Sequence, residues 1–235
     1  EKYRGSHPRK KTFSVSTQHY AFAVNAFVQV VRERGEDEYE FTLRETRTHE
    51  IIEDVRSLRS EIGVLYLSAF NEKVLNRLFR EYALAFTPLF TAKPHIFVSA
   101  SHPLAKKRKV KLEDLAPYPC LSFEQGEHNS FYFSEEILST LYKPKSVTVS
   151  DRATLFNLLI GINGYTISTG VLTEDLNGKA IVAVPLDIAE EITVGCVTRK
   201  GTPLSAIGAR YVEALSSFLP KKGRSQNTSA NHSSL

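Results

Sequence analysis

Apolar positions in the first sixty residues follow two alternating periods. From Thr12 to Ser16 the period is two, which is typical of a strand, and residues 23–31 place apolar side chains at helical spacing. After a break at 35–38, a strand pattern at 39–43 is followed by a second helical pattern at 51–58. This order predicts a strand–helix–strand–helix unit.

The next segment, Ile62–Leu67, is apolar at nearly every position. A strand with one face in solvent alternates between polar and apolar residues, whereas a strand covered on both faces reads as a continuous apolar run. We therefore expect a parallel sheet with helices on both of its sides.

The rest of the chain continues to alternate between helical and strand patterns. A helix is expected around 74–79, and strand-like runs follow at 83–90 and 95–100, where the chain is expected to cross into a second lobe. The elements expected there are strands at 120–123, 146–149 and 165–168 and helices at 130–142 and 155–159. A strand at 192–198 and a helix at 204–219 could return to the first lobe, but periodicity leaves that return open.

The formal charge of +4 is concentrated at the two ends of the chain. Residues 1–11 hold five Lys and Arg against one Glu, and residues 221–235 hold three basic residues and no acid, so the ends carry +4 and +3. Residues 12–220 are left with about −3. Because a mildly acidic body has no electrostatic attraction for phosphates, we do not expect it to bind DNA itself.

Several further features concern location and processing. No apolar run approaches the roughly 18–20 residues that cross a bilayer, and residues 1–11 contain no apolar signal segment, so a cytoplasmic location is expected. Cys120 and Cys196 form no Cys-x-x-Cys pair and are expected to be buried thiols. The absence of methionine fits a fragment, and residues 221–235 are expected to form a mobile tail.

A set of short segments occurs in a characteristic order. Pro88-Leu89-Phe90 precedes Ile96-Phe97-Val98, then Ser101-His102-Pro103-Leu104-Ala105 and the sequence VKLEDLA at 110–116. Later segments are Val149-Ser150-Asp151-Arg152, Gly161-Ile162-Asn163-Gly164 before the strand pattern at 165–168, and KGTPLS at 200–205. Over roughly residues 12–219, this order resembles the effector-binding domain of LysR-type transcriptional regulators.

The resemblance implies a type II periplasmic-binding-protein-like α/β fold, with two α/β lobes joined by two crossover strands and a ligand cleft between them. Residues 12–90 and 192–219 would then form lobe I, and residues 91–191 would form lobe II. Residues 1–11 would be a linker remnant or added residues, and residues 220–235 a flexible tail. A full family member also carries an N-terminal winged helix-turn-helix, so DNA would be bound only through that missing domain.

Polar residues that follow predicted strands are the candidate ligand contacts, because ligands of such folds bind between lobes near strand carboxyl ends. The candidates are Thr17, Gln18 and His19 at the start of the first helix, Ser68 after the apolar strand, and Gln125, Asn129, Ser130, Ser168 and Thr169 from the second lobe. Hydroxyl, amide and N–H donors at these places suit a small anion. A purely structural role is the alternative: Ser16 or Thr17 could cap the first helix, and Asn129 or Ser130 the helix at 130–142.

Motifs for catalysis are missing from the sequence. There is no His-Glu-x-x-His, Gly-x-Ser-x-Gly or phosphate-binding Gly-Lys-Ser/Thr, and the seven histidines form no metal-ligand cluster. Gly161 and Gly164 follow a helix, which favours helix termination over a dinucleotide site. We therefore expect no enzymatic activity, no cofactor and no metal. Two alternatives stay open: a transporter's solute-binding protein and an enzyme built on the same lobes.

The resemblance also implies partners. These are a small-molecule effector and a second copy of the chain, commonly in an antiparallel dimer or a tetramer, with no membrane partner. The helix at 23–31 is implicated in association because Phe22, Phe27 and Val28 supply more apolar surface than one buried stripe needs. Closure of the lobes on the effector would then change how paired domains present their DNA-binding halves.

Overall fold

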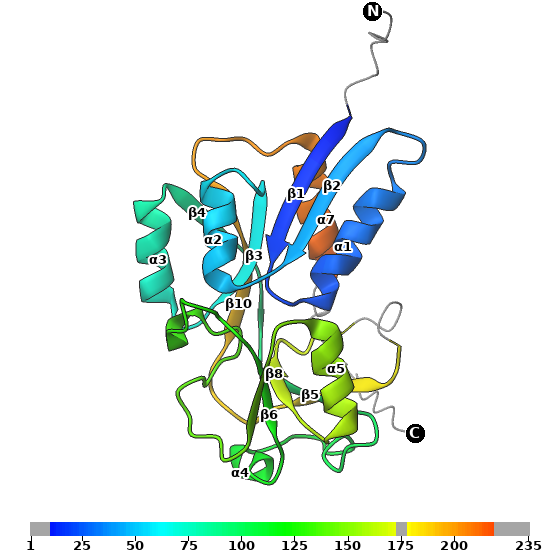
Figure 1. Ribbon diagram of the computed structural model, residues 1–235, viewed down its shortest axis with the longest axis vertical. Coiled ribbons are helices and arrows are strands. Elements are labelled where there is room, and N and C mark those ends of the chain that lie inside the picture. Colours follow the sequence, from blue (N-terminus) through cyan, green and yellow to red (C-terminus); the bar gives the residue numbers. More distant parts are fainter. Residues whose placement is uncertain (1–9, 173–177, 219–235) are drawn as a thin grey trace, which may run out of the picture.

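The computed structural model describes residues 10–172 and 178–218, which form two α/β lobes (Figure 1). Lobe I contains β1 (Lys11–Thr17), α1 (Ala21–Arg32), β2 (Tyr39–Glu45), α2 (Thr48–Arg56), β3 (Ile62–Leu67), α3 (Glu72–Glu81), β4 (Leu84–Ala92), β10 (Ile192–Arg199) and α7 (Ala206–Ser217). Lobe II contains β5 (His95–Ser99), α4 (Leu112–Leu115), β6 (Cys120–Phe123), the short 3-10 helix η1 (Phe131–Phe133), β7 (Ser146–Val149), α5 (Arg152–Gly161), β8 (Thr166–Ser168) and β9 (Ile181–Pro185). The tail expected at 220–235 and residues 1–9 lie outside the described residues.

The sheet of lobe I has the strand order β2-β1-β3-β10-β4. β1 pairs in parallel with both β2 and β3, as predicted. β10 is antiparallel to β3 and to β4, so the sheet is mixed, and the expected parallel arrangement does not extend to β10. The chain leaves the lobe through β4 and returns through β10, which inserts between strands much earlier in the sequence. These are the two crossover strands.

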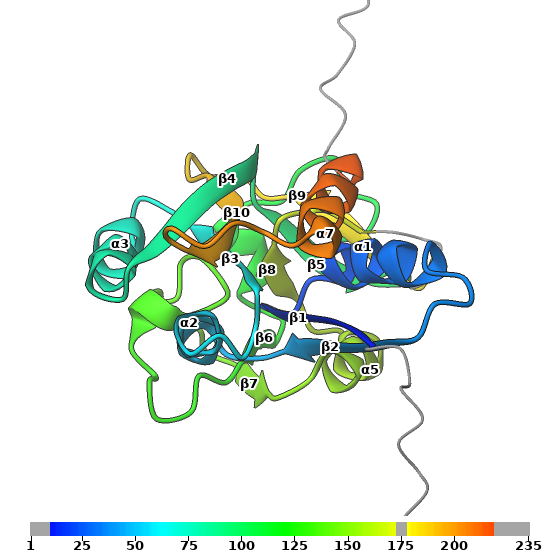
Figure 2. The same ribbon diagram turned by 90° about the horizontal axis from the view of Figure 1, so that it is seen from above.

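Helices cover both faces of this sheet (Figure 2). On β3, Val64 and Tyr66 belong to the cluster that includes side chains of α1 and α7, whereas Leu65 and Leu67 belong to the cluster formed with α2 and α3. All six residues of β3 are buried. The prediction of a strand covered on both faces is therefore confirmed.

A glycine sets the distance between α2 and this strand. A Cβ atom on Gly63 would lie 2.7 Å from Cγ2 of Ile51 and 3.0 Å from Cγ2 of Val55. Both are much shorter than a normal carbon–carbon contact. Gly63 is thus required for the close packing of α2 on β3.

Helix α1 uses more of its apolar surface inside its own lobe than the sequence suggested. Phe22 is 1% exposed and contacts the rings of Tyr20 and Phe90, so it is not available to a partner. Phe27 packs against Phe13 in an aromatic group but stays partly exposed. The expectation that Phe22 offers apolar surface for association is wrong, because this side chain is buried in the core of lobe I.

Lobe II contains a three-stranded antiparallel sheet, β8-β5-β9, and a parallel pair, β6-β7. The predicted helix at 130–142 is wrong: only η1 is helical, and turns follow it. Within those turns Leu138 has a φ of 59°, a left-handed conformation that a right-handed helix excludes. The loop instead directs two carboxylates to separate partners, as described below.

The two cysteines are free and buried, as predicted. Cys120 lies in lobe II and Cys196 in lobe I. Across residues 10–172 and 178–218, no helix combines the length and the apolarity needed to cross a membrane.

Candidate functional site

A pocket between the two lobes forms the candidate site. Lobe I contributes His19 and Tyr20 at the start of α1, and lobe II contributes Glu135, Arg152 and Ser168. Most of its apolar walls come from lobe II, and they include Phe97, Phe123, Leu155, Phe156, Ile167 and Leu172. The free space is about 30 Å³, which holds one or two water molecules but no metabolite.

The contact between His19 and Glu135 closes this pocket. The backbone N–H of His19 donates to Oε2 of Glu135 over 3.0 Å, and Nδ1 of the ring lies 2.9 Å from Oε1. Because an ionised carboxylate only accepts hydrogen bonds, Nδ1 carries the proton. Both side chains are 5% exposed. Lobe I thus binds a carboxylate of lobe II with two donors shielded from water.

Phe123 supports the imidazole from lobe II. The two rings are parallel within 6°, with centroids 3.9 Å apart. Burial alone lowers the pKa of His19, but the hydrogen bond and the charge of Glu135 outweigh that effect and raise the pKa above its ordinary value. The ring therefore favours its charged form, and its contact with Glu135 is a charge-assisted hydrogen bond.

The neighbouring carboxyl group, Glu136, points to a different partner. Its Oε1 accepts the backbone N–H of Phe123 at 3.0 Å, inside lobe II. Burial, followed by the nearby charge of Glu135, raises the pKa of Glu136 to about 8. At neutral pH, Glu136 is therefore largely protonated.

Arg152 supplies a second cation at the pocket. It is the first residue of α5, directly after Asp151, whose side chain caps that helix by accepting the N–H of Thr154. Nε of Arg152 lies 3.0 Å from Oε1 of Glu45 in lobe I, and the guanidinium carbon lies 5.9 Å from the ring centre of Phe156. The helix start therefore places a guanidinium at the lobe boundary, where it can attract an anion.

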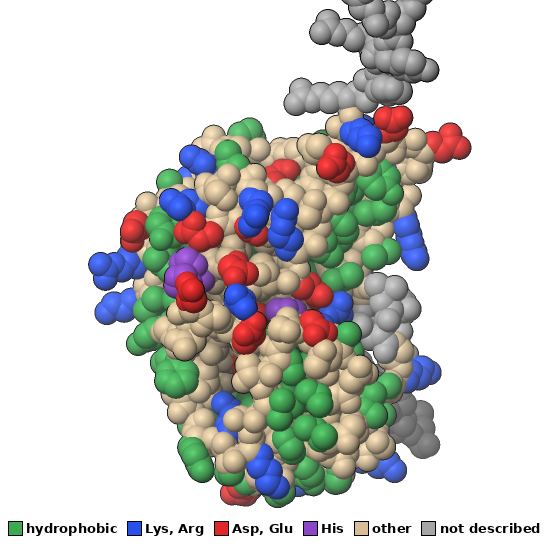
Figure 3. Space-filling model, in the orientation of Figure 1, with side chains coloured by type: hydrophobic (Ala, Val, Ile, Leu, Met, Phe, Trp, Pro, Cys, Tyr) green, Lys and Arg blue, Asp and Glu red, His purple; other side chains and the backbone are tan. Residues whose placement is uncertain are grey.

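Further polar contacts join the lobes beside the pocket. Arg47 pairs with Glu124, and the backbone N–H of Thr48 at the start of α2 donates to Oε1 of Gln125 at 3.0 Å. Charged side chains of both signs gather between the lobes on this face of the molecule (Figure 3). The lobes are held together by several contacts that involve no ligand.

Two histidines form another interlobe contact. His49 on α2 and His128 in lobe II stack with ring centroids 3.5 Å apart and planes within 4°. Nearby, Gly126 has a φ of 59°, and a Cβ atom there would lie 2.7 Å from the guanidinium of Arg47. The glycine allows both the left-handed turn and this close approach.

The structure places Thr17 and Gln18 inside lobe I. Thr17 is the last residue of β1, and its hydroxyl donates to the carbonyl of Gln18. Gln18 accepts hydrogen bonds from the N–H of Tyr66 and the hydroxyl of Tyr20, and its Nε2 donates to Thr48. Neither residue begins α1, which starts at Ala21 without a side-chain cap. The expectation that Thr17 and Gln18 begin the first helix is wrong. Their side chains form hydrogen bonds inside lobe I instead.

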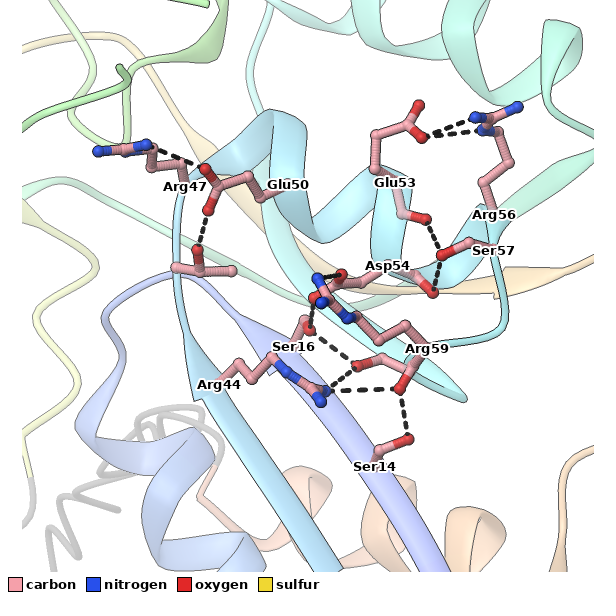
Figure 4. A network of polar contacts seen from close by, with 12 residues as sticks. Ser14, Ser16, Arg44, Arg47, Glu50, Glu53, Asp54, Arg56, Ser57 and Arg59 are labelled. Atoms are coloured by element: carbon pink, nitrogen blue, oxygen red, sulfur yellow. Dashed lines mark hydrogen bonds and ion pairs between the residues drawn. The ribbon is translucent and has the colours of Figure 1, made fainter. Parts of the chain in front are cut away.

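Ser16, the alternative cap, connects β1 to α2 instead. Its hydroxyl donates to Oδ2 of Asp54 at 2.6 Å and lies 2.8 Å from the hydroxyl of Ser60. Asp54 is also paired with Arg59 at 3.4 Å (Figure 4). This network anchors α2 and leaves Ser16 with no capping role.

The other predicted residues are dispersed. Ser68 lines a different interlobe pocket, with Tyr66 and Ile137, and its N–H donates to Asn71. Thr169 is buried, and its hydroxyl accepts the N–H of Val171. Ser168 shares the pocket of His19, and Gln125 forms the interlobe bond described above.

Asn129 and Ser130 are exposed, and Ser130 makes no side-chain cap bond at η1. The capping role expected for them on a helix at 130–142 is wrong, because that helix does not form.

Sequence reasoning missed Glu135 and Arg152. Glu135 stands 116 residues from His19 in the chain, and no local pattern joins them. Arg152 had a usable signal, since an Asp cap and the start of a helix place it at a helix end that faces the lobe boundary. Among the described residues, no three His, Cys, Asp or Glu gather as a group that could hold a metal ion.

Comparison with known proteins identifies relatives of this domain. A family model described as the LysR substrate binding domain matches residues 32–220. A comparison with curated proteins gives no match.

Solved structures of similar fold are numerous. The reduced form of the OxyR regulatory domain from Pseudomonas aeruginosa is 14% identical, with a TM-score of 0.60 and coverage of 88% of this chain and 96% of that one. HinK, a LysR family transcriptional regulator from the same organism, is 14% identical, with a TM-score of 0.57 over 92% of this chain and 72% of its own. The effector-binding domain of QuiR in complex with shikimate is 14% identical, with a TM-score of 0.57 over 89% and 97%.

Proposed function

Since this chain belongs to the LysR substrate binding domain family, we propose that it senses a small anionic metabolite in the pocket between its two lobes. The family supplies the effector-binding domain of LysR-type transcriptional regulators. The proposed role is regulatory rather than catalytic, and DNA is contacted through a helix-turn-helix domain of the full regulator in the cytoplasm.

One observation carries the choice of pocket. The pocket is lined from both lobes, and it brings together the imidazole and N–H of His19 with the guanidinium of Arg152. Cations and N–H donors in an enclosed site with apolar walls favour an anion over a neutral or cationic ligand. The QuiR domain in complex with shikimate is a case in which a protein of this fold holds a small metabolite.

Thermal-shift screening of the chain against small organic anions tests the proposal. A ligand that binds only the folded protein raises the Tm with increasing concentration. We expect a ligand found in this way to lose most of its effect with Arg152→Ala. The matched control is Arg108→Ala, because Arg108 is an exposed arginine of lobe II that does not line the pocket.

If the ligand binds Arg152→Ala and His19→Asn as tightly as the unchanged chain, the interlobe pocket is not its site. If it binds none of the chains, even at millimolar concentration, and no other anion binds either, the sensing function itself is wrong.

The same proposal includes association through α1. Val24, Phe27, Val28 and Val31 are only partly buried and recur at helical spacing, which leaves an apolar strip on one face of the helix. We propose that this strip packs against lobe II of a second copy in an antiparallel dimer, as one step towards a dimer or tetramer.

Sedimentation equilibrium of Val28→Glu tests the dimer. Burial of a charge in an apolar contact is costly, so we expect a monomer where the unchanged chain associates. Ile160→Glu is the control, because Ile160 is an exposed apolar residue on α5, away from the strip. A chain that sediments as a monomer at high concentration before any substitution would refute this dimer.

A further inference from the structure

The interlobe pocket already contains a carboxylate. Glu135 places one oxygen 3.0 Å from the N–H of His19 and the other 2.9 Å from its Nδ1. A backbone N–H and an imidazole can both donate charge-assisted hydrogen bonds to a carboxylate, and such bonds are stronger than neutral ones. Both partners are 5% exposed, so the contact lies in a nearly dry environment where charge-assisted hydrogen bonds are strong.

We propose that Glu135 is an internal occupant of the anion position in the pocket, and that the effector is an apolar monocarboxylate which takes this position by displacing Glu135. The inference rests on the proposed function, since it assigns the ligand class and the regulation of the same pocket.

The walls around the carboxylate define the class of ligand. Beyond His19 and Arg152 the lining is dominated by aliphatic and aromatic side chains, among them Phe97, Leu155, Phe156, Ile167 and Leu172. One carboxylate satisfies the donors of His19, and the rest of the ligand meets apolar surface. A second charge would be buried against these walls, which is costly and disfavours dicarboxylates.

The size of the pocket requires displacement. The free space of about 30 Å³ admits no organic acid while Glu135 is in place. Glu135 lies on a segment of bends and turns rather than in a helix, so its side chain can leave without unwinding a regular element. A ligand must therefore compete with Glu135. Its apparent affinity equals its intrinsic affinity multiplied by the fraction of molecules in which Glu135 has left the anion position.

Glu135 also explains how the lobes hold together with no ligand. It is a carboxylate of lobe II that lobe I binds inside the pocket, in the place where an effector would connect the two lobes. Displacement by a free acid replaces a tethered carboxylate with an untethered one, and so changes the contact that fixes the lobes relative to each other. This is the step at which effector binding alters the arrangement of the domain.

Chemical rescue tests the internal occupant directly. Glu135→Ala deletes the CH₂–COO⁻ end of the side chain, and acetate has the size and charge of the missing group. We expect acetate to raise the Tm of Glu135→Ala by about 3–5 °C for each tenfold increase in concentration above its Kd. Acetamide, which is isosteric but uncharged, and sodium chloride at the same ionic strength should have no such effect.

Two controls separate a specific site from a general effect of salt. The unchanged chain should not respond to acetate, because Glu135 already fills the position. Glu124→Ala removes another interlobe carboxylate, but its ion pair with Arg47 is partly exposed and not enclosed. It should be insensitive to acetate. A folded Glu135→Ala that acetate does not stabilise, or equal stabilisation of Glu124→Ala, overturns the inference.

Glu135→Gln decides the question if Glu135→Ala does not fold. Its neutral amide keeps the shape of Glu135 and competes less strongly for a charged imidazole. We expect phenylacetate, measured by calorimetry, to bind Glu135→Gln at least about tenfold more tightly than the unchanged chain. Equal or weaker binding overturns the inference.

These results are distinguishable from those that test the proposed function. A metabolite that binds the unchanged chain and Glu135→Gln equally would support sensing and overturn displacement. Acetate rescue without any metabolite ligand would support the occupied anion position and count against sensing.

Discussion

The N–H group and Nδ1 of His19 both lie within 3.0 Å of the carboxylate of Glu135, which belongs to the other lobe. This contact couples the protonation of one side chain to the closure of the pocket. A carboxylate that is bound by two donors and excluded from water holds the imidazole in its charged form. The strength of the interlobe contact must therefore depend on pH.

We predict that replacing His19 with Asn costs more stability at pH 6 than at pH 9. The folded-state pKa of His19 is raised, so its stabilising effect is complete below the unfolded value of about 6.5 and is lost as pH rises through the folded value. The Asn amide can still donate a hydrogen bond but does not titrate. We expect a loss of about 1–2 kcal/mol at pH 6 and less at pH 9, from urea unfolding. If the stability loss caused by His19→Asn were larger at pH 9 than at pH 6, the ion pair would be contradicted.

Glu136→Gln should stabilise the protein at pH 8. The folded pKa of Glu136 is about 8, above its unfolded value, so the folded state retains a proton that the unfolded chain releases, and stability falls as pH rises from about 4.5 to 8. Gln removes this penalty and can still accept the N–H of Phe123. We expect a gain on the order of 2 kcal/mol at pH 8 and little change at pH 4.

The matched control for this prediction is Glu127→Gln, an exposed acid of the same loop. It should leave the free energy of unfolding unchanged across this range of pH. If Glu136→Gln shows the same flat profile as the control, Glu136 ionises normally in the folded protein, and the prediction that it keeps its proton at neutral pH is wrong.

The elements of lobe I were largely predictable because their patterns are set by burial. The continuous apolar run of β3 reflects helices on both faces, and Leu65 and Val64 indeed enter opposite clusters. The antiparallel direction of β10 was not predictable, since a strand's hydrophobic pattern is the same in either direction.

The loop after β6 shows why the site was only partly predictable. Phe133, Ile137 and Leu141 are spaced by four residues, which favours a helix. Tertiary contacts prevail instead: Glu135 and Glu136 are adjacent but bind different lobes, and Leu138 has a left-handed φ that a regular helix excludes. His19 was found from its place after β1, whereas its partner could be found only in three dimensions.

Gln125→Ala should loosen the lobes locally. The Gln125 side chain accepts the N–H of Thr48 at the start of α2, so it serves as a cap from the opposite lobe. We expect a loss of about 1 kcal/mol and faster hydrogen exchange at the Thr48 amide. Ser130→Ala is the control, because Ser130 is exposed and makes no cap bond. Unchanged exchange at Thr48 would mean that water replaces this bond without loss.

Gly63→Ala should reduce stability and disturb the site from a distance. The new Cβ would lie 2.7 Å from Ile51 on α2, so the helix must shift, and we expect a cost of about 1–3 kcal/mol in urea unfolding. The same substitution at Gly161, where no atom lies within 4 Å, should cost nothing measurable. Because α2 begins at Thr48, whose N–H bonds Gln125, its shift should also speed exchange at that amide. A Gly63→Ala chain as stable as Gly161→Ala would show that α2 can shift without a cost in stability. The interlobe contacts at the start of α2 would then not fix the position of the pocket.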